Sequence, residues 1–407
     1  MTETPRLAID PSWETERRLG RDLLDRPGLT DVMDALDGEA VLVGGAVRDS
    51  LMGRPAGDVD LSTPLTPETV RARLTKAGLK AIPTGIEHGT VTAVAQHAAF
   101  EITTFRADVQ TDGRRATVAF STDMAADAER RDFTMNALYA TQDGRVLDPL
   151  GGLADLAARR VRFIGSPEAR IREDYLRILR FFRFTAWHAC AGEDGIDAEG
   201  LAACAALGAG VERLARERIG HEMRRLLAAP DPATATAAMA ASGVLARCLP
   251  GANAAVLAPL VHVERALGRA PDWRLRLVAM GGEDASASLR LSRAEARTLE
   301  TWMAAVAKGA SPAATAWRHG AEAGWAALIL GVVAGQPLPE RDAAQRLIAD
   351  AATAEIPIAA ADLVASGIRP GPKLGEALAA AERAWIESGF ALDKSALLTE
   401  FGGRSAG

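Results

Sequence analysis

The stretch "GGAVRDSLMGRPAGDVDLST", residues 44–63, joins a glycine pair to an arginine and to the aspartate pair of "DVD". It continues the apolar run "EAVLVGG", residues 39–45, which predicts a buried strand that enters a tight turn. "AVRDSLMG", residues 46–53, predicts a short helix, and the alternation in "GDVDLST" predicts a second strand. Side chains two residues apart on a strand point to the same face, so Asp58 and Asp60 would present two carboxylates side by side.

These residue types suit a metal-assisted phosphoryl transfer. Adjacent carboxylates repel each other unless a cation joins them, and hard oxygen ligands suit Mg²⁺. In two-metal chemistry, one ion activates the attacking oxygen and the other holds the leaving phosphates. Gly44 and Gly45 allow backbone N–H groups to approach a polyphosphate near a helix N-terminus, and Arg48 follows one helical turn later. Each motif alone is more often structural, so the prediction depends on their conjunction.

Composition narrows the class of protein. The chain has 407 residues, of which 48% are hydrophobic, and a net charge of −6, which favours two or three folded domains over disorder. Arginines crowd residues 158–225. The cysteines Cys190, Cys204 and Cys248 show no CxxC spacing, which argues against a zinc site and against a disulfide framework. The sequence shows no apolar run long enough for a membrane span and no apolar signal region, so we expect a cytoplasmic protein.

The first part of the chain predicts mixed helices and strands, whereas the strand signals nearly vanish after residue 159. Residues 13–37 predict a helix with exposed charges, and the polar residues 106–120 predict a mobile loop. A capping threonine and a following proline, Thr66 and Pro67, predict the start of another helix. Strands are predicted at residues 89–95 and 100–105. Residues 144–156 predict a further strand that runs into a glycine turn. Residues 166–187 are helical, and the pattern leaves open whether they form one helix or two.

Four further motifs follow in order. They are "RRDFTMNAL" (130–138), "DPLGGLADL" (148–156), "EDYLRILRFFRF" (173–184) and "RERIGHEM" (216–223). Together with residues 44–63, they resemble the ordered motifs of the tRNA nucleotidyltransferase/poly(A) polymerase family in its bacterial and eukaryotic class. The resemblance covers residues 40–225, and the remainder matches no family motif.

The resemblance implies an α+β fold, in which a polymerase-β-like nucleotidyltransferase palm precedes all-helical parts. On this basis we expect a head, or palm, at residues 20–157. A helical neck that selects the nucleotide and binds RNA would span residues 158–228. A helical body and tail that bind tRNA would span residues 229–407. The sequence does not decide the oligomeric state.

The same resemblance implies the site residues. Asp58 and Asp60 would hold Mg²⁺, and Glu101 is the candidate for a third catalytic carboxylate, although a salt-bridged strand carboxylate is an equally good reading. The expected nucleotide contacts are Gly44, Gly45, Arg48, Arg131, Asp132, Asn136, Asp174, Arg177, Arg180 and Arg183. If "RRDFTMNA" is helical, Asp132 and Asn136 would lie at i and i+4 on one face, where they could bind ribose hydroxyls.

The pair Asp174 and Arg177 suggests how a base could be chosen without a template. Cytosine and adenine both present an amino donor beside a ring acceptor, which match an aspartate acceptor and an arginine donor. Uracil and guanine reverse this order and would leave buried polar groups unpaired, which is costly. We expect the two side chains at i and i+3 of one helix.

The expected activity is transfer of CMP, CMP and AMP from CTP and ATP to the 3′ end of tRNA. A retained flexible loop with Asp108, Asp112, Arg114 and Arg115 would point to complete CCA addition, as the resemblance implies. The alternatives are a poly(A) polymerase and a non-catalytic RNA-binding relative. The basic helix expected at residues 213–227 is as compatible with a solvated face as with contacts to tRNA phosphates.

Overall fold

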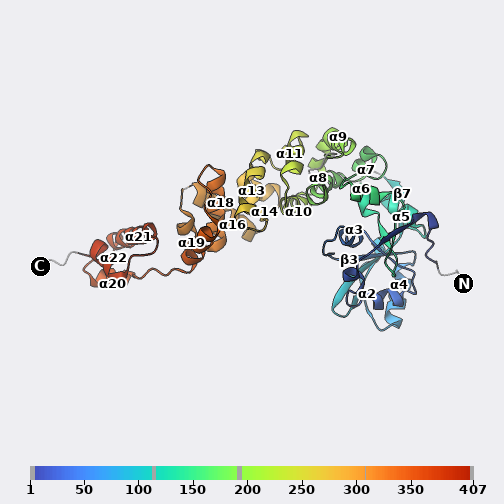
Figure 1. Cartoon of the computed structure of the whole chain (residues 1–407), viewed down its shortest axis with the longest axis horizontal. Helices are drawn as coiled ribbons and strands as arrows, with labels where there is room; N and C mark the ends of the chain where they lie inside the picture. The colour runs from blue at the N-terminus through green and yellow to red at the C-terminus, as the bar shows by residue number, and fades with distance from the viewer. Residues whose placement is uncertain (1–4, 112–115, 190–194, 308, 404–407) are drawn as a thin grey trace. The chain divides into compact units, whose positions relative to one another are not determined.

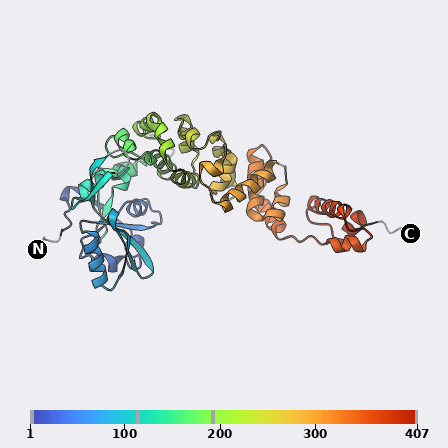
Figure 2. The ribbon, with the colours of Figure 1, turned by 180° about the vertical axis from the view of Figure 1, so that it is seen from behind.

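The computed structural model describes residues 5–111, 116–189, 195–307 and 309–403. The chain forms two compact units, Met1–Pro250 and Gly251–Gly407, and each is described by itself (Figures 1 and 2). The first unit contains a large mixed sheet followed by helices, and the described part of the second is helical. The α+β class is therefore confirmed. The finer division at residues 157 and 228 stays a prediction.

The sheet of the first unit has eight strands. In spatial order they are β1 (Glu14–Arg18), β10 (Arg145–Leu147), β9 (Tyr139–Ala140), β2 (Val41–Val43), β3 (Val59–Thr63), β6 (Ala98–Thr104), β5 (Thr90–Ala95) and β4 (Lys80–Gly85). Of the paired strands in this sheet, β3 and β6 are parallel and the others antiparallel. The parallel pair places Asp60 opposite Glu101 in register.

Helices cover the sheet and extend the first unit. Those of the head are α1 (Arg21–Leu24), α2 (Leu29–Ala35), α3 (Gly45–Leu51), α4 (Pro67–Lys76), α5 (Met124–Glu129) and α6 (Gly152–Ala157), with short 3₁₀ helices η1 (Pro11–Trp13), η2 (Ile86–His88) and η3 (Thr134–Asn136). Helix α4 packs on β4, β5 and β6, and α3 packs on β2 and β3 (Figure 1). A core cluster buries Val41, Val43, Phe105 and Tyr139 with residues of α5.

The glycine turn has the geometry that the sequence predicts. Strand β2 ends at Val43, and Gly44 adopts φ 71° and ψ −126°, a conformation that favours glycine. The Gly44 amide donates to the carbonyl of Leu138, and α3 begins at Gly45. The turn thus passes directly from a buried strand into a helix N-terminus. The capping prediction at Thr66 is also confirmed, since its side chain accepts from the Thr69 amide.

Two predictions for the head are wrong. Residues 14–18 form the edge strand β1 rather than a helix, because their backbone pairs with β10 and the Thr15 hydroxyl donates to the carbonyl of Val146. Residues predicted as a loop instead form two antiparallel strands, β7 (Arg106–Thr111) and β8 (Ala116–Phe120). Tertiary pairing overrides the weak local signal in both places. The loop residues Asp112, Arg114 and Arg115 lie outside the described residues, as does the side chain of Asp108.

Further helices complete the first unit. Those within the expected neck are α7 (Pro167–Glu173), α8 (Leu176–His188), α9 (Ala198–Leu207), η4 (Gly208–Arg213) and α10 (Arg216–Leu227), whereas α11 (Ala233–Ala241) and α12 (Val244–Cys248) follow it. Residues 166–187 therefore form two helices, separated at Asp174, whose backbone is extended at φ −151° and ψ 108°. Phe181 and Phe182 are fully buried and Phe184 is 5% exposed, as expected of core residues.

The second unit is built around α18 (Ala321–Val333), of which residues 323–330 are all buried. The remaining helices are η5 (Ala254–Val256), α13 (Leu257–Ala266), α14 (Trp273–Met280), α15 (Ala285–Ser288), α16 (Arg293–Ala307), α17 (Pro312–His319), α19 (Arg341–Thr353), α20 (Ala360–Ala365), α21 (Pro372–Glu387) and α22 (Lys394–Phe401). Helices α13, α16, α17 and α19 pack on α18. Among the described residues, no helix combines the length and apolar character that crossing a membrane requires.

The glycine of the "DPLGGLADL" motif gives a test of this packing. A Cβ at Gly152 would lie 2.8 Å from the carbonyl carbon of Thr134. Gly152→Ala is therefore expected to lower the free energy of unfolding of the first unit by about 1–3 kcal/mol, because overpacking a fixed backbone contact strains it. Urea unfolding followed by circular dichroism measures this change. The matched control is Gly57→Ala, where nothing lies within 4 Å; equal midpoints for the two variants would contradict the steric argument.

Candidate active site

A cleft of about 540 Å³ lies in the first unit, between the glycine turn, η3 and the neck helices α8 and α10. It is lined by eleven of the predicted site residues, namely Gly44, Gly45, Arg48, Asp60, Arg131, Asp132, Asn136, Asp174, Arg177, Arg180 and Arg183. Four further lining residues are not among the predicted site residues, namely Leu176, Phe184, Arg218 and Arg225. The structure thus brings together segments of the chain that extend from Gly44 to Arg225.

Of the three predicted catalytic carboxylates, Asp60 lines the cleft, whereas Asp58 and Glu101 are not among its lining residues. Asp60 and Glu101 are register partners on neighbouring strands, and Asp58 directly precedes β3; all three are exposed. Desolvation and the negative charges of Glu101 and Asp58, opposed by Arg131, raise the pKa of Asp60 to about 6. Among the described residues, no three His, Cys, Asp or Glu side chains form a ready-made metal site. The carboxylates nevertheless form an oxygen donor set whose mutual repulsion a divalent cation would relieve.

Asp132 connects the head to the neck. Its Oδ1 atom accepts from Asn136 Nδ2 at 2.9 Å, and its Oδ2 atom accepts from Arg180 Nε at 2.7 Å. Arg48 in turn donates from Nη1 to Asn136 Oδ1 at 2.6 Å. The expected helix at this motif is absent, because Thr134–Asn136 forms a single 3₁₀ turn. That turn still brings Asp132 and Asn136 together, so the predicted pairing holds although the predicted helix is wrong.

Arg131 is fixed from three sides beneath the glycine turn. Its Nη2 atom donates to Asp127 Oδ2 at 2.8 Å and to Ser62 Oγ at 3.2 Å, and the same Asp127 oxygen accepts from the Tyr139 hydroxyl at 2.9 Å. Burial opposes the charge, but Tyr139 and Asp127 outweigh it and raise the pKa of Arg131. A Cβ at Gly44 would lie 3.6 Å from Arg131 Nη1. The guanidinium is therefore a permanent cation directly under the turn.

Three guanidinium groups converge on Phe184. The Cζ atoms of Arg48, Arg180 and Arg183 lie 5.2, 5.3 and 4.5 Å from its ring centroid, within cation–π range. Arg183 also pairs with the buried Glu222 at 2.5 Å, and desolvation lowers the pKa of Arg183 to about 10. The Phe184 ring and the carboxylates that pair with these arginines hold the like-charged guanidinium groups close together. Such a wall of cations suits a polyphosphate.

The predicted base-selecting pair does not lie on one helix. Asp174 occupies the extended break after α7, whereas Arg177 lies in the first turn of α8. The Asp174 Oδ1 atom accepts from the Leu176 amide at 3.0 Å, which caps α8. Arg177 Nη1 donates to the carbonyl of Arg170 at 2.7 Å and also pairs with Glu173. Both side chains line the cleft, so the geometry that we expected is wrong while the convergence of the two groups is observed.

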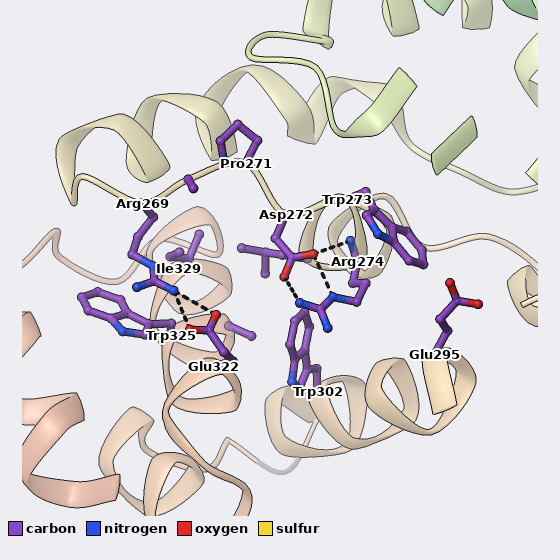
Figure 3. Close-up of a pocket in the computed structure, with 13 residues that line it drawn as sticks. Arg269, Pro271, Asp272, Trp273, Arg274, Glu295, Trp302, Glu322, Trp325 and Ile329 are labelled. Carbon is purple, nitrogen blue, oxygen red and sulfur yellow. Dashed lines mark hydrogen bonds and ion pairs between the residues drawn. The ribbon is translucent and has the colours of Figure 1, made fainter. Parts of the chain in front are cut away.

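The second unit contains a separate cavity of about 460 Å³ (Figure 3). Arg269 lies over Trp325 and pairs with Glu322, and Arg274 lies over Trp302. Arg274 also pairs with Asp272 at 2.7 Å. Since its two arginines are accompanied by the three lining carboxylates Asp272, Glu295 and Glu322, this cavity lacks the excess positive charge of the cleft in the first unit. We therefore assign the candidate active site to the first unit.

Comparison with known proteins agrees with this assignment. Residues 40–162 match the family model of the poly A polymerase head domain, and residues 195–256 match that of the probable RNA and SrmB-binding site of polymerase A. The solved structure of the Bacillus stearothermophilus CCA-adding enzyme in complex with CTP is similar, with a TM-score of 0.67 and 27% identity. The similarity covers 93% of this chain and 94% of that chain.

Curated relatives match about half of this chain. The chain is 44% identical over 202 residues to the CCA tRNA nucleotidyltransferase 1, mitochondrial, of Danio rerio, which is 49% of this chain and 46% of that protein. It is 39% identical over 235 residues to the CCA-adding enzyme of Leuconostoc citreum, which is 57% of this chain and 56% of that protein. The chain thus matches about half the length of these relatives.

Because the pKa of Asp60 is raised, removal of its charge is expected to stabilise the fold by an amount that depends on pH. Because the folded-state value of about 6 lies above the unfolded value of about 3.9, the charged carboxylate destabilises the fold above pH 6 and this penalty disappears as the pH falls below about 4. With EDTA present, Asp60→Asn should therefore melt above the wild type at pH 7.5, and the difference should shrink towards pH 4.5. Differential scanning fluorimetry measures it. Glu16→Gln, on the exposed strand β1, is the control, and a difference that is constant with pH would contradict the argument.

Proposed function

We propose that this chain, whose head and RNA-binding segments belong to the tRNA nucleotidyltransferase/poly(A) polymerase family, adds CMP, CMP and AMP to the 3′ end of tRNA. The observation that carries the proposal is that one cleft is lined by Asp174 and Arg177, by the arginines around Phe184, and by Asp60. A base-reading pair, a polyphosphate site and a metal-binding carboxylate in one cleft fit template-independent nucleotidyl transfer.

The carboxylates Asp58, Asp60 and Glu101 would hold the divalent ions, which we propose to be Mg²⁺. When bound, these ions would lower the pKa of the attacking hydroxyl and neutralise the phosphates. The donor set fits because it is all oxygen and because its charges repel one another in their absence. In the reaction, the 3′-oxygen of the tRNA forms a bond to the α-phosphorus of CTP or ATP. The bond from that phosphorus to the β-phosphate oxygen breaks, and pyrophosphate leaves.

The chain's own residues orient the nucleotide. Arg48, Arg180 and Arg183 supply positive charge for the triphosphate. Arg131 lies under the glycine turn, after which the first amides of α3 would face the phosphates. Asp132 already accepts from Asn136 and the Phe133 amide through Oδ1, and it pairs with Arg180 through Oδ2. Its main contribution is therefore to position these neighbours, and a ribose contact would require it to exchange a partner.

Base choice follows from donor and acceptor order. The Asp174 carboxylate accepts from the amino group of cytosine or adenine, and Arg177 donates to the adjacent ring nitrogen. UTP and GTP would leave both groups unpaired, and each unpaired buried group costs about 1–3 kcal/mol. If both contacts are lost, UTP and GTP are expected to bind roughly two to three orders of magnitude more weakly than CTP and ATP.

Poly(A) polymerase remains the alternative because the head-domain model carries that name. The relatives that bear CCA-adding names at 39–44% identity favour tRNA. The intact set of Asp58, Asp60, Arg48, Asp174 and Arg177 disfavours a non-catalytic RNA-binding relative. The cytoplasmic location stays a prediction, and the name of the Danio rerio relative includes the word mitochondrial.

A gel assay with tRNA transcripts that end before CCA tests the proposal. With Mg²⁺ and CTP alone we expect two added nucleotides, and one more when ATP is also supplied. A long ladder with ATP alone would assign the chain to the poly(A) polymerases. Arrest after two cytidines would limit it to CC addition, and no extension at all would support the RNA-binding alternative.

The carboxylates give a second test. Asp58→Ala/Asp60→Ala is expected to lower the rate of transfer by roughly 10³-fold, since metal ions contribute several kcal/mol to the transition state. The affinity for tRNA, measured by filter binding, should stay near the wild-type value. Glu16→Gln serves again as the charge control. Retention of more than a tenth of the wild-type rate would contradict the assignment of the metal site.

A further inference from the structure

Arg218 contacts the base-selecting residue directly, although the sequence did not single it out. Its Nη2 atom lies 2.7 Å from Asp174 Oδ2, and the same side chain lines the cleft. The side chains of Arg218 and Asp174 are 47% and 37% exposed, so the pair lies at the open side of the site, where an incoming base would arrive. The contact joins the N-terminal part of α10 to the break before α8.

The spacing on α10 explains how Arg218 reaches the cleft. Arg218, Glu222 and Arg225 lie at i, i+4 and i+7, which places them on one face of the helix. Glu222 pairs with Arg183, and the Arg225 carbonyl accepts from Trp187 Nε1 at 2.7 Å. Three successive turns of α10 therefore contact α8 or the break that precedes it. This face of α10 therefore holds α8 and the break before it, which carry the residues that face the nucleotide.

Asp174 has two distinct restraints. Its Oδ1 atom caps α8 through the Leu176 amide, and its Oδ2 atom is held by Arg218. The backbone of the break is anchored separately, because the Tyr175 ring fills the space beside Gly210, where a Cβ would lie 2.5 Å from the ring carbon Cγ. Arg213 also lies over that ring, at 5.5 Å. Removal of Arg218 would thus release one carboxylate oxygen without removing what holds the main chain.

We propose that Arg218 is a positioning residue for base selection, which holds the Asp174 carboxylate so that it accepts from the amino group of cytosine or adenine. Each carboxylate oxygen has a second lone pair, so Asp174 keeps an acceptor site for the base while bound to Arg218. Without Arg218, the carboxylate can rotate about its side-chain torsions, and the acceptor that rejects uracil and guanine loses its fixed place. This inference rests on the proposed function of the cleft.

Equilibrium binding of CTP and UTP to the full chain in Mg²⁺ tests the proposal, measured by isothermal titration calorimetry. Arg218→Ala is expected to lower the ratio of CTP affinity to UTP affinity by roughly tenfold, which is the effect of one misplaced polar contact at a desolvated site. Arg218→Lys, which keeps a cation, should restore part of the ratio. Arg216→Ala is the matched control, because Arg216 is an exposed arginine of the same helix that does not line the cleft.

A double variant separates positioning from simple charge. If Arg218 acts through Asp174, adding Arg218→Ala to Asp174→Ala should leave the CTP/UTP ratio unchanged. Equal loss of CTP and UTP affinity in Arg218→Ala would show that Arg218 only attracts phosphates, and this would overturn the proposal. An unchanged ratio, or the same loss in Arg216→Ala, would overturn it as well.

The binding measurement does not require turnover. If the wild type distinguishes CTP from UTP but transfers no nucleotide to tRNA, the proposed function fails while the role of Arg218 stands. If the wild type binds CTP and UTP equally, both Asp174 and Arg218 lose their assigned roles. Should Arg218→Ala melt below the wild type, Arg218→Gln, which keeps the volume of the side chain, replaces it in the same titration.

Discussion

The site depends on the Asp132 carboxylate more than on any other group. It is buried, yet it accepts hydrogen bonds from Asn136, Arg180 and the Phe133 amide. Burial opposes its ionisation, but Arg180 and Asn136 outweigh this and lower the pKa of Asp132 below its ordinary value. A buried charge of this kind is costly to leave unpaired. The sheet-bearing head and α8 must therefore keep this relative position wherever the site is intact.

A second ion pair within the neck also restricts the position of α8. Helix α8 pairs with Asp132 of the head through Arg180, and three residues later Arg183 pairs with Glu222 of α10. A helix held by two such ion pairs cannot rotate about its axis without breaking them. The nucleotide-facing side chains are thereby fixed in advance, which reduces the reorganisation needed when charge develops in the transition state.

The sequence predicted those features that depend on local backbone chemistry. The glycine turn at Gly44, the cap at Thr66 and the strand around Asp60 follow from turn, capping and alternation rules, and the structure has them. Strand β1 was missed because its five residues are stabilised by pairing with β10, which lies more than a hundred residues away in the chain. The sequence left open a break near Ile171, and the break at Asp174 was not located because no glycine or proline marks the end of α7.

The site was predicted less completely than the fold elements for a related reason. Motif residues such as Arg48 and Arg131 could be carried over position by position, whereas Arg218 matters only through its contact with Asp174, 44 residues earlier. A stripe at i, i+4 and i+7 on a basic helix is equally typical of a solvated face. What distinguishes the two is a partner on another helix, and a single sequence does not show such partners.

The charges of the cleft show what this arrangement achieves. Seven arginines and three aspartates line it, in a chain whose net charge is −6. A cleft built for affinity alone would leave its cations unpaired, but Arg131, Arg177, Arg180, Arg183 and Arg218 each have a carboxylate partner. Each partner reduces the local potential and fixes a donor direction. The cleft therefore gives up part of its attraction for any polyphosphate, and the fixed donors that result are what a base-specific site requires.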